Sequence, residues 1–184
     1  MNCIKITTLF VAFLVSSIAV AGPAGPYLGL EGVYSDADVS ESGISFDDNS
    51  FGFKLYGGYR FGVGNALDYF AVEASWQDLG EFEDNILGSE VELEVDGFTV
   101  DFLGFVPLND RIELFGKLGY FDFEGDGSID GIDLGSADED GLNLGVGIDS
   151  QIGRISVRGE FTWFDVDDID LWTVGIGAQW NFGS

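Results

Sequence analysis

The chain has 184 residues, of which 33 are acidic, seven are basic and none is histidine, so its formal net charge is −26. This excess of negative charge excludes nucleic acid as a partner, because binding to phosphates requires a basic surface. A chain this acidic would ordinarily be expected to be disordered. However, 46% of the residues are hydrophobic and 17 are phenylalanine, which predicts a folded body with the charge concentrated elsewhere.

The first part of the chain has the organisation of a secretory signal peptide. A basic start is followed by an almost uncharged, mostly apolar run at residues 6–20, with a small-x-small cleavage pattern just before Gly22. The alternative, a transmembrane helix, fits less well because the run is too short to span a bilayer comfortably. We therefore expect residues 1–21 to be removed and residues 22–184 to form one domain. Cys3 would leave with the signal peptide, so no disulfide is expected.

The remaining chain contains eight runs in which apolar and polar residues alternate, and no stretch has convincing helical periodicity. Alternation with a period of two predicts β-strands, because successive side chains on a strand point to opposite faces. The runs lie near residues 27–35, 50–61, 67–78, 91–106, 111–123, 141–151, 154–164 and 171–182.

The gaps between these runs alternate in kind. Those at residues 62–66, 107–110 and 152–153 are short, whereas the others are acidic and mostly longer. Short turns at one rim and long loops at the other are typical of an up-and-down transmembrane barrel. We therefore predict an all-β fold, an eight-stranded antiparallel up-and-down barrel, whose closure removes exposed strand edges.

The last run shows best how such a strand would face lipid. From residue 172 to residue 182 one face is wholly apolar, with aromatic side chains at both ends, and the other face is small and polar. Across the chain, aromatic residues collect at the ends of runs and predict two girdles. One contains Phe61, Phe70, Trp180 and Phe182 at the short-turn rim, and the other contains Tyr34, Phe51, Trp76, Phe98, Tyr120, Trp163 and Trp172.

Charge is sorted along the chain. Residues 36–49, 78–96, 122–140 and 165–170 hold 25 of the 33 acidic residues and no lysine or arginine. Arg111 and Arg154 begin strands at the short-turn rim, and the other basic residues after the signal peptide have the parity of the barrel interior. These four residues are Lys54, Arg60, Lys117 and Arg158.

At this point the chain resembles the OmpA-like transmembrane barrels of Gram-negative outer membranes, in particular the small porin-family members. The resemblance is strongest at residues 51–61, residues 68–80 and the terminal strand. It implies an outer-membrane location, contact with membrane lipid and lipopolysaccharide, and a monomer. Trp180 and Phe182 resemble the terminal signal that the barrel-assembly machinery binds. No peptidoglycan-binding domain follows, so a tether to the cell wall is not expected.

Seven charged residues are predicted to share one depth in the barrel interior. They are Glu31, Lys54, Glu73, Asp101, Lys117, Arg158 and Glu160. An eight-stranded barrel is just wide enough for side chains to fill it, and a buried unpaired charge costs several kcal/mol. A polar plug that fixes strand register is therefore the favoured interpretation, and a gated ion path through exchangeable salt bridges is the alternative.

The third long acidic segment, at residues 124–141, spaces carboxylates among glycines in a way that suits weak Ca²⁺ or Mg²⁺ binding. The candidate ligands are Asp126, Asp130, Asp133 and Asp138. The spacing does not fit an EF-hand loop, and a solvated, mobile acidic loop is the alternative. No other cofactor is predicted.

Enzymatic activity is not expected. The barrel enzymes that this chain resembles in size use a catalytic histidine, which it lacks, and no pair of carboxylates is singled out by spacing. The sequence predicts a structural or surface-interaction protein. The alternatives are a narrow channel or carrier for small solutes, and a secreted lipocalin-like barrel that binds a ligand.

Overall fold

The computed structural model describes the backbone of residues 23–41, 44–61, 70–86, 89–129, 132–166 and 169–183. Within these ranges, the side chains of residues 37–48, 81–93, 128–134, 136 and 167–170 lie outside the description. The eight strands are β1 (Gly25–Glu41), β2 (Ile44–Arg60), β3 (Phe70–Ile86), β4 (Ser89–Pro107), β5 (Ile112–Ile129), β6 (Ile132–Ile152), β7 (Ile155–Val166) and β8 (Ile169–Asn181).

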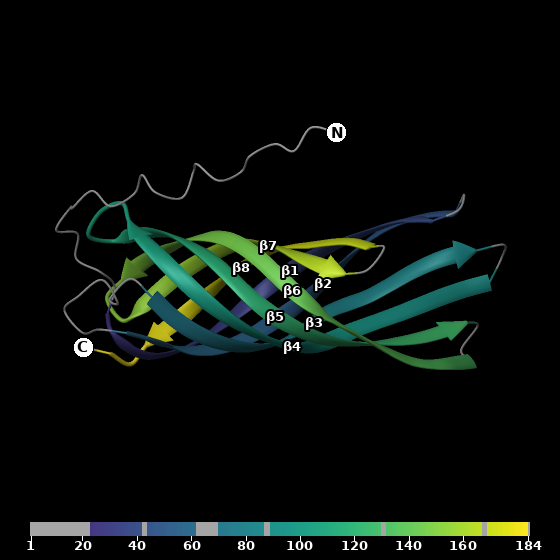
Figure 1. Ribbon diagram of the computed structural model, residues 1–184, viewed down its shortest axis with the longest axis horizontal. Coiled ribbons are helices and arrows are strands. Elements are labelled where there is room, and N and C mark those ends of the chain that lie inside the picture. The colour runs from purple at the N-terminus through teal and green to yellow at the C-terminus, as the bar shows by residue number, and fades with distance from the viewer. Residues whose placement is uncertain are drawn as a thin grey trace, which may run out of the picture.

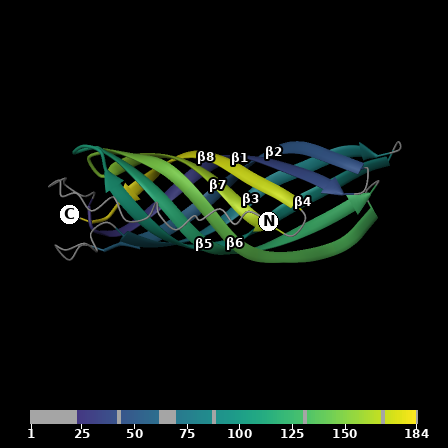
Figure 2. The same cartoon turned by 45° about the horizontal axis from the view of Figure 1, so that its top comes forward.

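The strands form a closed antiparallel barrel in sequence order, as predicted. Each strand pairs with the next, and β8 pairs with β1 to close the sheet (Figures 1 and 2). Because every strand has two neighbours, no backbone edge is left unpaired along the body of the barrel. No helix in the described part of the chain is long and apolar enough to cross a membrane.

The acidic segments that were predicted as loops are mostly strand, so that part of the prediction is wrong. Backbone pairing continues from Phe123↔Glu139 to Ile129↔Ile132 between β5 and β6, and from Asp36↔Asn49 to Glu41↔Ile44 between β1 and β2. Only two residues separate the strands at each of these ends. Figure 1 shows these hairpins and β3–β4 projecting past β7–β8, at the end opposite the C-terminus.

The third strand carries a local irregularity where the barrel meets its projecting hairpin. The pairing of β3 with β4 shifts between Asp78 and Glu81. Gly80 has a φ of +84°, and its amide donates a hydrogen bond of 2.8 Å to the Asp78 carboxylate. Such a bulge favours glycine, and a Cβ at Gly80 would also lie 2.3 Å from the Ser50 hydroxyl. The predicted start of this strand, residues 67–69, lies outside the described residues.

The outward face of the barrel is apolar. Most outward-facing apolar residues of β6, β7 and β8 are exposed, including Val146, Val157 and Ile176. Rings meet around both rims, for example Tyr34 against Phe51 at 5.1 Å and Phe70 stacked on Phe102 at 5.2 Å between centroids. An apolar band with aromatic residues at both edges is the surface that a membrane barrel presents to lipid.

Candidate functional site

The structure brings the seven predicted interior charges together inside the barrel. They come from β1 (Glu31), β2 (Lys54), β3 (Glu73), β4 (Asp101), β5 (Lys117) and β7 (Arg158, Glu160), and none is more than 7% exposed. Each lies at an inward position of its strand, because the alternating pattern places the apolar neighbours on the lipid side.

Lys54 lies among three carboxylates. Its Nζ is 2.5 Å from Glu160 Oε1, 3.4 Å from Glu31 and 3.7 Å from Glu73. Lys117 reaches the same oxygen of Glu160 at 2.9 Å. The contacts of Glu160 connect β7 with strands that are not its neighbours, and the two lysines neutralise charge that would otherwise be costly to bury.

Arg158 is completely buried and joins two further carboxylates. It donates a hydrogen bond of 2.7 Å to Glu73 and lies 3.7 Å from Asp149. Its guanidinium also stacks over aromatic rings, at 4.7 Å from the centroid of Tyr56 and 4.9 Å from that of Phe115. Such contacts stabilise a desolvated guanidinium. Arg158 is thus held by charge on one side and by rings on the other.

Asp101 is placed differently from the other six charges. Its carboxylate accepts a hydrogen bond of 2.9 Å from Thr99, whose hydroxyl is 2.7 Å from that of Ser75. No salt bridge joins Asp101 to a basic residue among the described residues. Asp101 is thus buried at an inward position, and its described partner is a hydroxyl group rather than a cation.

Three further lumen groups, Tyr27, Glu113 and Asp149, were missed, whereas the interior parity of Arg60 was predicted. Asp149 joins Arg158, and Tyr27 donates a hydrogen bond of 2.9 Å to Glu73. Nearer the short turns, Arg60 holds Glu113 with two hydrogen bonds of 2.6 and 2.9 Å across the barrel. All of them share the inward parity that identified the seven, so parity alone could have found them.

Two apolar layers lie on either side of the charges. Along β5, Phe115, Lys117 and Phe121 are buried in the lumen in that order. The short-turn apolar layer consists of Tyr27, Tyr56, Ala71, Leu103, Phe105 and Phe115. The hairpin-end apolar layer consists of Val33, Leu79, Phe121, Phe123, Phe164 and Leu171.

The hairpin-end apolar layer is tightly built around three phenylalanines. Phe121 and Phe123 lie 4.8 Å apart, and Phe164 lies 5.3 and 5.2 Å from them, measured between ring centroids. Aromatic pairs at these separations are favourable beyond their buried area. Val95 and Val166 pack against the same cluster. The lumen at this level therefore contains hydrocarbon rather than charge.

Carboxylates face each other across the strands from the level of the hairpin-end apolar layer toward the hairpin tips. Asp122 pairs with Asp140 and Glu124 with Asp138 between β5 and β6, and Glu124 also pairs with Asp96 of β4. Like charges directly opposite each other on a sheet are destabilising. The strand pairing of β4, β5 and β6 at this end is therefore opposed by electrostatic repulsion between the paired carboxylates.

The predicted metal ligands are only partly described. Asp126 and Asp138 are exposed, whereas Asp130 and the side chain of Asp133 lie outside the described residues. Within the described part of the chain, no group of three or more candidate ligands is placed to hold a metal ion. The weak divalent site thus stays a prediction.

Solved structures of several bacterial outer-membrane proteins are similar to this chain. The attachment invasion locus protein Ail of Yersinia pestis, in complex with the heparin analogue sucrose octasulfate, is 21% identical with a TM-score of 0.58, covering 85% of this chain and 98% of that chain. Neisserial surface protein A is 12% identical with a TM-score of 0.65, covering 88% and 99%. OprG of Pseudomonas aeruginosa is 14% identical with a TM-score of 0.54, covering 88% and 98%.

At these identities the likeness shows the fold alone, and no curated protein matches the chain. Residues 6–182 match the family model described as the outer membrane protein beta-barrel domain. This match covers nearly the whole chain and agrees with the closed barrel, the apolar outer band and the aromatic rims. The chain therefore belongs to the outer membrane β-barrel family and is a protein of the Gram-negative outer membrane.

Proposed function

We propose that this protein is a non-catalytic outer-membrane barrel with a closed lumen, whose acidic hairpins interact with other components of the cell surface. The observation that carries the proposal is the layered lumen. Ion pairs centred on Lys54 and Arg158 lie between two apolar layers. Because solutes would have to cross both hydrocarbon and paired charge, the barrel acts as a rigid support rather than a path.

The acidic hairpins are proposed as the interacting surface. Barrels of this kind extend farther from the membrane on the extracellular side than on the periplasmic side. The hairpins β1–β2, β3–β4 and β5–β6 form the projecting end, so we place the carboxylates of β3–β6 on the extracellular side. Lipopolysaccharide is itself anionic, and Ca²⁺ or Mg²⁺ would be needed to bridge its phosphates to the protein. A polysulfated ligand like the one bound to Ail is disfavoured by the acidic charge of this surface, so we do not transfer it.

Several further features are part of the proposal. Residues 1–21 are a cleaved signal peptide, Trp180 and Phe182 form the signal for the barrel-assembly machinery, and the barrel is a monomer. The resemblance of the terminal strand and the leader pattern support these assignments. The secreted lipocalin-like alternative is wrong, because the chain is an outer-membrane protein.

A narrow channel is the second candidate function. It is favoured by buried polar atoms in the lumen that have no hydrogen-bond partner among the described residues, including both amide atoms of Asn143 and the hydroxyl of Thr162. Polar atoms of this kind are rare in a fully packed interior. They lie on β6 and β7, beside the ion pairs.

Conductance separates the two candidates. In planar bilayers the unmodified protein should show no current steps, and neither should the Lys117→Met/Arg158→Met variant, because both apolar layers remain in place. Insertion is verified by the different gel mobility of boiled and unboiled samples, since a closed barrel resists detergent unfolding. Discrete current steps from the unmodified protein would overturn the closed lumen and support the channel.

A divalent cation should order the β5–β6 hairpin. Because Glu124 faces Asp138 across the strands, neutralising their repulsion should close the hairpin more firmly. We expect millimolar Ca²⁺, the range of weak extracellular sites, to slow proteolysis within residues 124–141 compared with EDTA. The Asp126→Asn/Asp138→Asn variant should lose most of this protection. Equal cleavage in Ca²⁺ and EDTA would show that the cation does not order the hairpin and that its carboxylates are simply solvated.

A further inference from the structure

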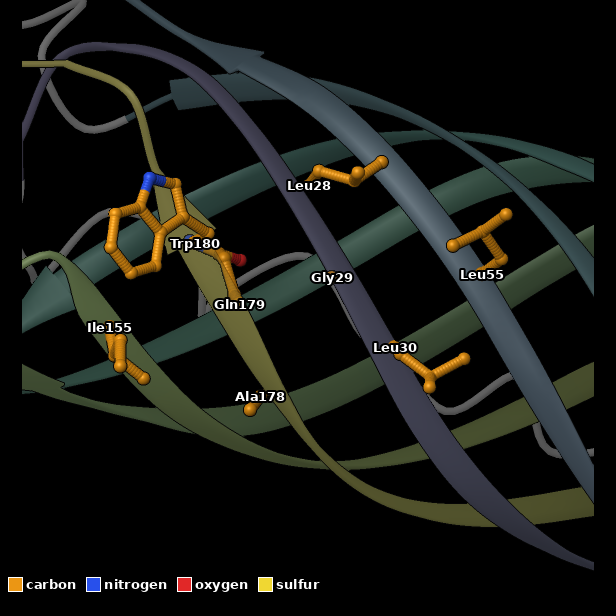
Figure 3. A pocket seen from close by; sticks show the side chains of 8 residues that line it. All are labelled: Leu28, Gly29, Leu30, Leu55, Ile155, Ala178, Gln179 and Trp180. Atoms are coloured by element: carbon orange, nitrogen blue, oxygen red, sulfur yellow. The ribbon is translucent and has the colours of Figure 1, made fainter.

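A shallow groove lies on the outer wall where β1 and β8 close the barrel (Figure 3). Its volume is about 310 Å³, and its lining is almost entirely apolar. The apolar lining side chains are Leu28, Leu30, Leu55, Ile155, Ala178 and Trp180, and Gly29 and Gln179 complete the lining. They come from β1, β2, β7 and β8, so the groove follows the closing pair of strands and their two neighbours.

The groove exists because Ala178 is small. In the register of β8, Ala178 lies opposite Leu30 on one side and Val157 on the other. The next outward position toward the short turns is Trp180, which lies between Leu28 and Ile155. A methyl group surrounded by longer side chains leaves a depression, and Figure 3 shows Ala178 as the short side chain among them.

A basic residue lies in the short turn that leads into β7, next in sequence to the groove residue Ile155. Arg154 immediately precedes Ile155, and its carbonyl accepts a hydrogen bond of 2.8 Å from the Asn181 amide of β8. This bond fixes the turn beside the terminal strand. The Arg154 side chain is exposed, and within the described residues no carboxylate forms a salt bridge with it. Among the other described basic residues, Arg111 is also exposed, whereas Lys54, Arg60, Lys117 and Arg158 are buried.

We propose that the groove and Arg154 together bind one anionic phospholipid of the periplasmic leaflet, with an acyl chain along Ala178 and the phosphate at Arg154. Short turns mark the periplasmic side, and Trp180 occupies the headgroup level, where tryptophan is enriched. The inference depends on the outer-membrane location and not on the closed lumen or the acidic hairpins.

The expected selectivity for an anionic lipid comes from the attraction between its headgroup and Arg154. A lipid chain gains little from leaving hydrocarbon for an apolar groove, because lipid tails are as apolar as leucine. The groove supplies van der Waals packing, and the guanidinium supplies attraction to a negative headgroup. One arginine near an anionic surface contributes about fivefold in occupancy, equivalent to ~1 kcal/mol.

Fluorescence of Trp180 can report the bound lipid. The chain has four tryptophans, and replacing Trp76, Trp163 and Trp172 with phenylalanine leaves Trp180 alone. This protein is reconstituted in phosphatidylcholine containing a small fraction of phosphatidylglycerol with brominated chains, which quench tryptophan on contact. We expect quenching of Trp180 that corresponds to about fivefold enrichment over the bulk mole fraction.

Matched variants locate the site. Ala178→Phe should abolish the enrichment, so that quenching of Trp180 corresponds to the bulk mole fraction of the brominated lipid. Ala74→Phe, at an exposed alanine on β3, should leave the enrichment unchanged. Arg154→Gln should remove most of the preference for phosphatidylglycerol. In a protein that retains only Trp163, at the opposite rim, the quenching should correspond to the bulk mole fraction of the brominated lipid. Folding of each variant is checked by gel mobility before and after boiling.

Three results would overturn the proposal. Quenching of Trp180 at the bulk mole fraction in the parent protein would mean that no lipid is selected. Enrichment that persists in Ala178→Phe would place the lipid elsewhere. Quenching below the bulk mole fraction, together with cross-linked dimers, would show that a second copy of the chain covers the groove.

Discussion

Replacing Arg158 with methionine should destabilise the folded barrel by about 3–5 kcal/mol, the usual cost of removing one partner of a buried ion pair. The change leaves Glu73 with one salt-bridge partner among the described residues, the more distant Lys54 at 3.7 Å, and removes the salt bridge of Asp149. It also removes the guanidinium from the rings of Tyr56 and Phe115. The free energy of unfolding is measured by urea titration in phospholipid vesicles.

Two variants control for this prediction. Arg111→Met removes an exposed arginine at the short-turn rim and should change stability by no more than about 0.5 kcal/mol. Adding Glu73→Gln to Arg158→Met should recover part of the loss, because the carboxylate left without its arginine is then neutral. A loss below about 1 kcal/mol for Arg158→Met would mean that the lumen is hydrated enough to screen the charge.

Replacing Ile176 with arginine should cost about 2–4 kcal/mol, the penalty for a charge on the lipid face near the bilayer midplane. Ile176 is 69% exposed on the outward face of β8, midway between the aromatic residues Trp172 and Trp180. Val174→Arg should behave similarly. Both values come from refolding titrations of the protein in vesicles.

The matched control is Ile152→Arg, at the short-turn end of β6. Ile152 is also 69% exposed, but it lies at the membrane edge, where the penalty falls to about 0–1 kcal/mol. Gln179→Ala changes an inward residue whose amide donates a 2.7 Å hydrogen bond to Asn181, and should cost about 1 kcal/mol. Equal costs at Ile152 and Ile176 would show that the apolar band does not set the depth of the protein in the membrane.

The architecture was predictable from sequence because a strand that separates lipid from the lumen must alternate strictly. The terminal strand shows this best. Val174, Ile176 and Ala178 face outward, whereas Thr173 and Gln179 are buried inside. The match of residues 6–182 to the barrel family confirms the predicted class and location.

The ends of the strands were not predictable in the same way. Aspartate and glycine are depleted in strands, so segments such as residues 124–141 were interpreted as loops. The structure pairs Glu124 with Asp138 and Gly125 with Ala137. Backbone pairing continues there because each strand already lies beside its partner when it leaves the membrane, and this geometry overrides the propensities of single residues.

The lumen was partly accessible to sequence reasoning. Parity and depth identified Lys54, Arg158 and the five other charges as one set, because all lie at a similar distance from the short turns. The apolar layers were not identified because parity was applied only to charged residues, although Phe115 and Phe121 share the inward parity of Lys117. Which residues meet across the lumen depends on the relative shift of all eight strands, which no single run encodes.

The ion pairs of the lumen also have a kinetic consequence. Lys54 and Glu160 are separated by 106 residues, and Glu73 and Arg158 by 85 residues. Contacts between such distant segments form only after β7 reaches its place, near the end of assembly, because long loops must close first. Interactions absent from the transition state mainly slow unfolding. The buried charges should therefore determine how long a finished barrel persists, with little influence on how quickly its first hairpins form.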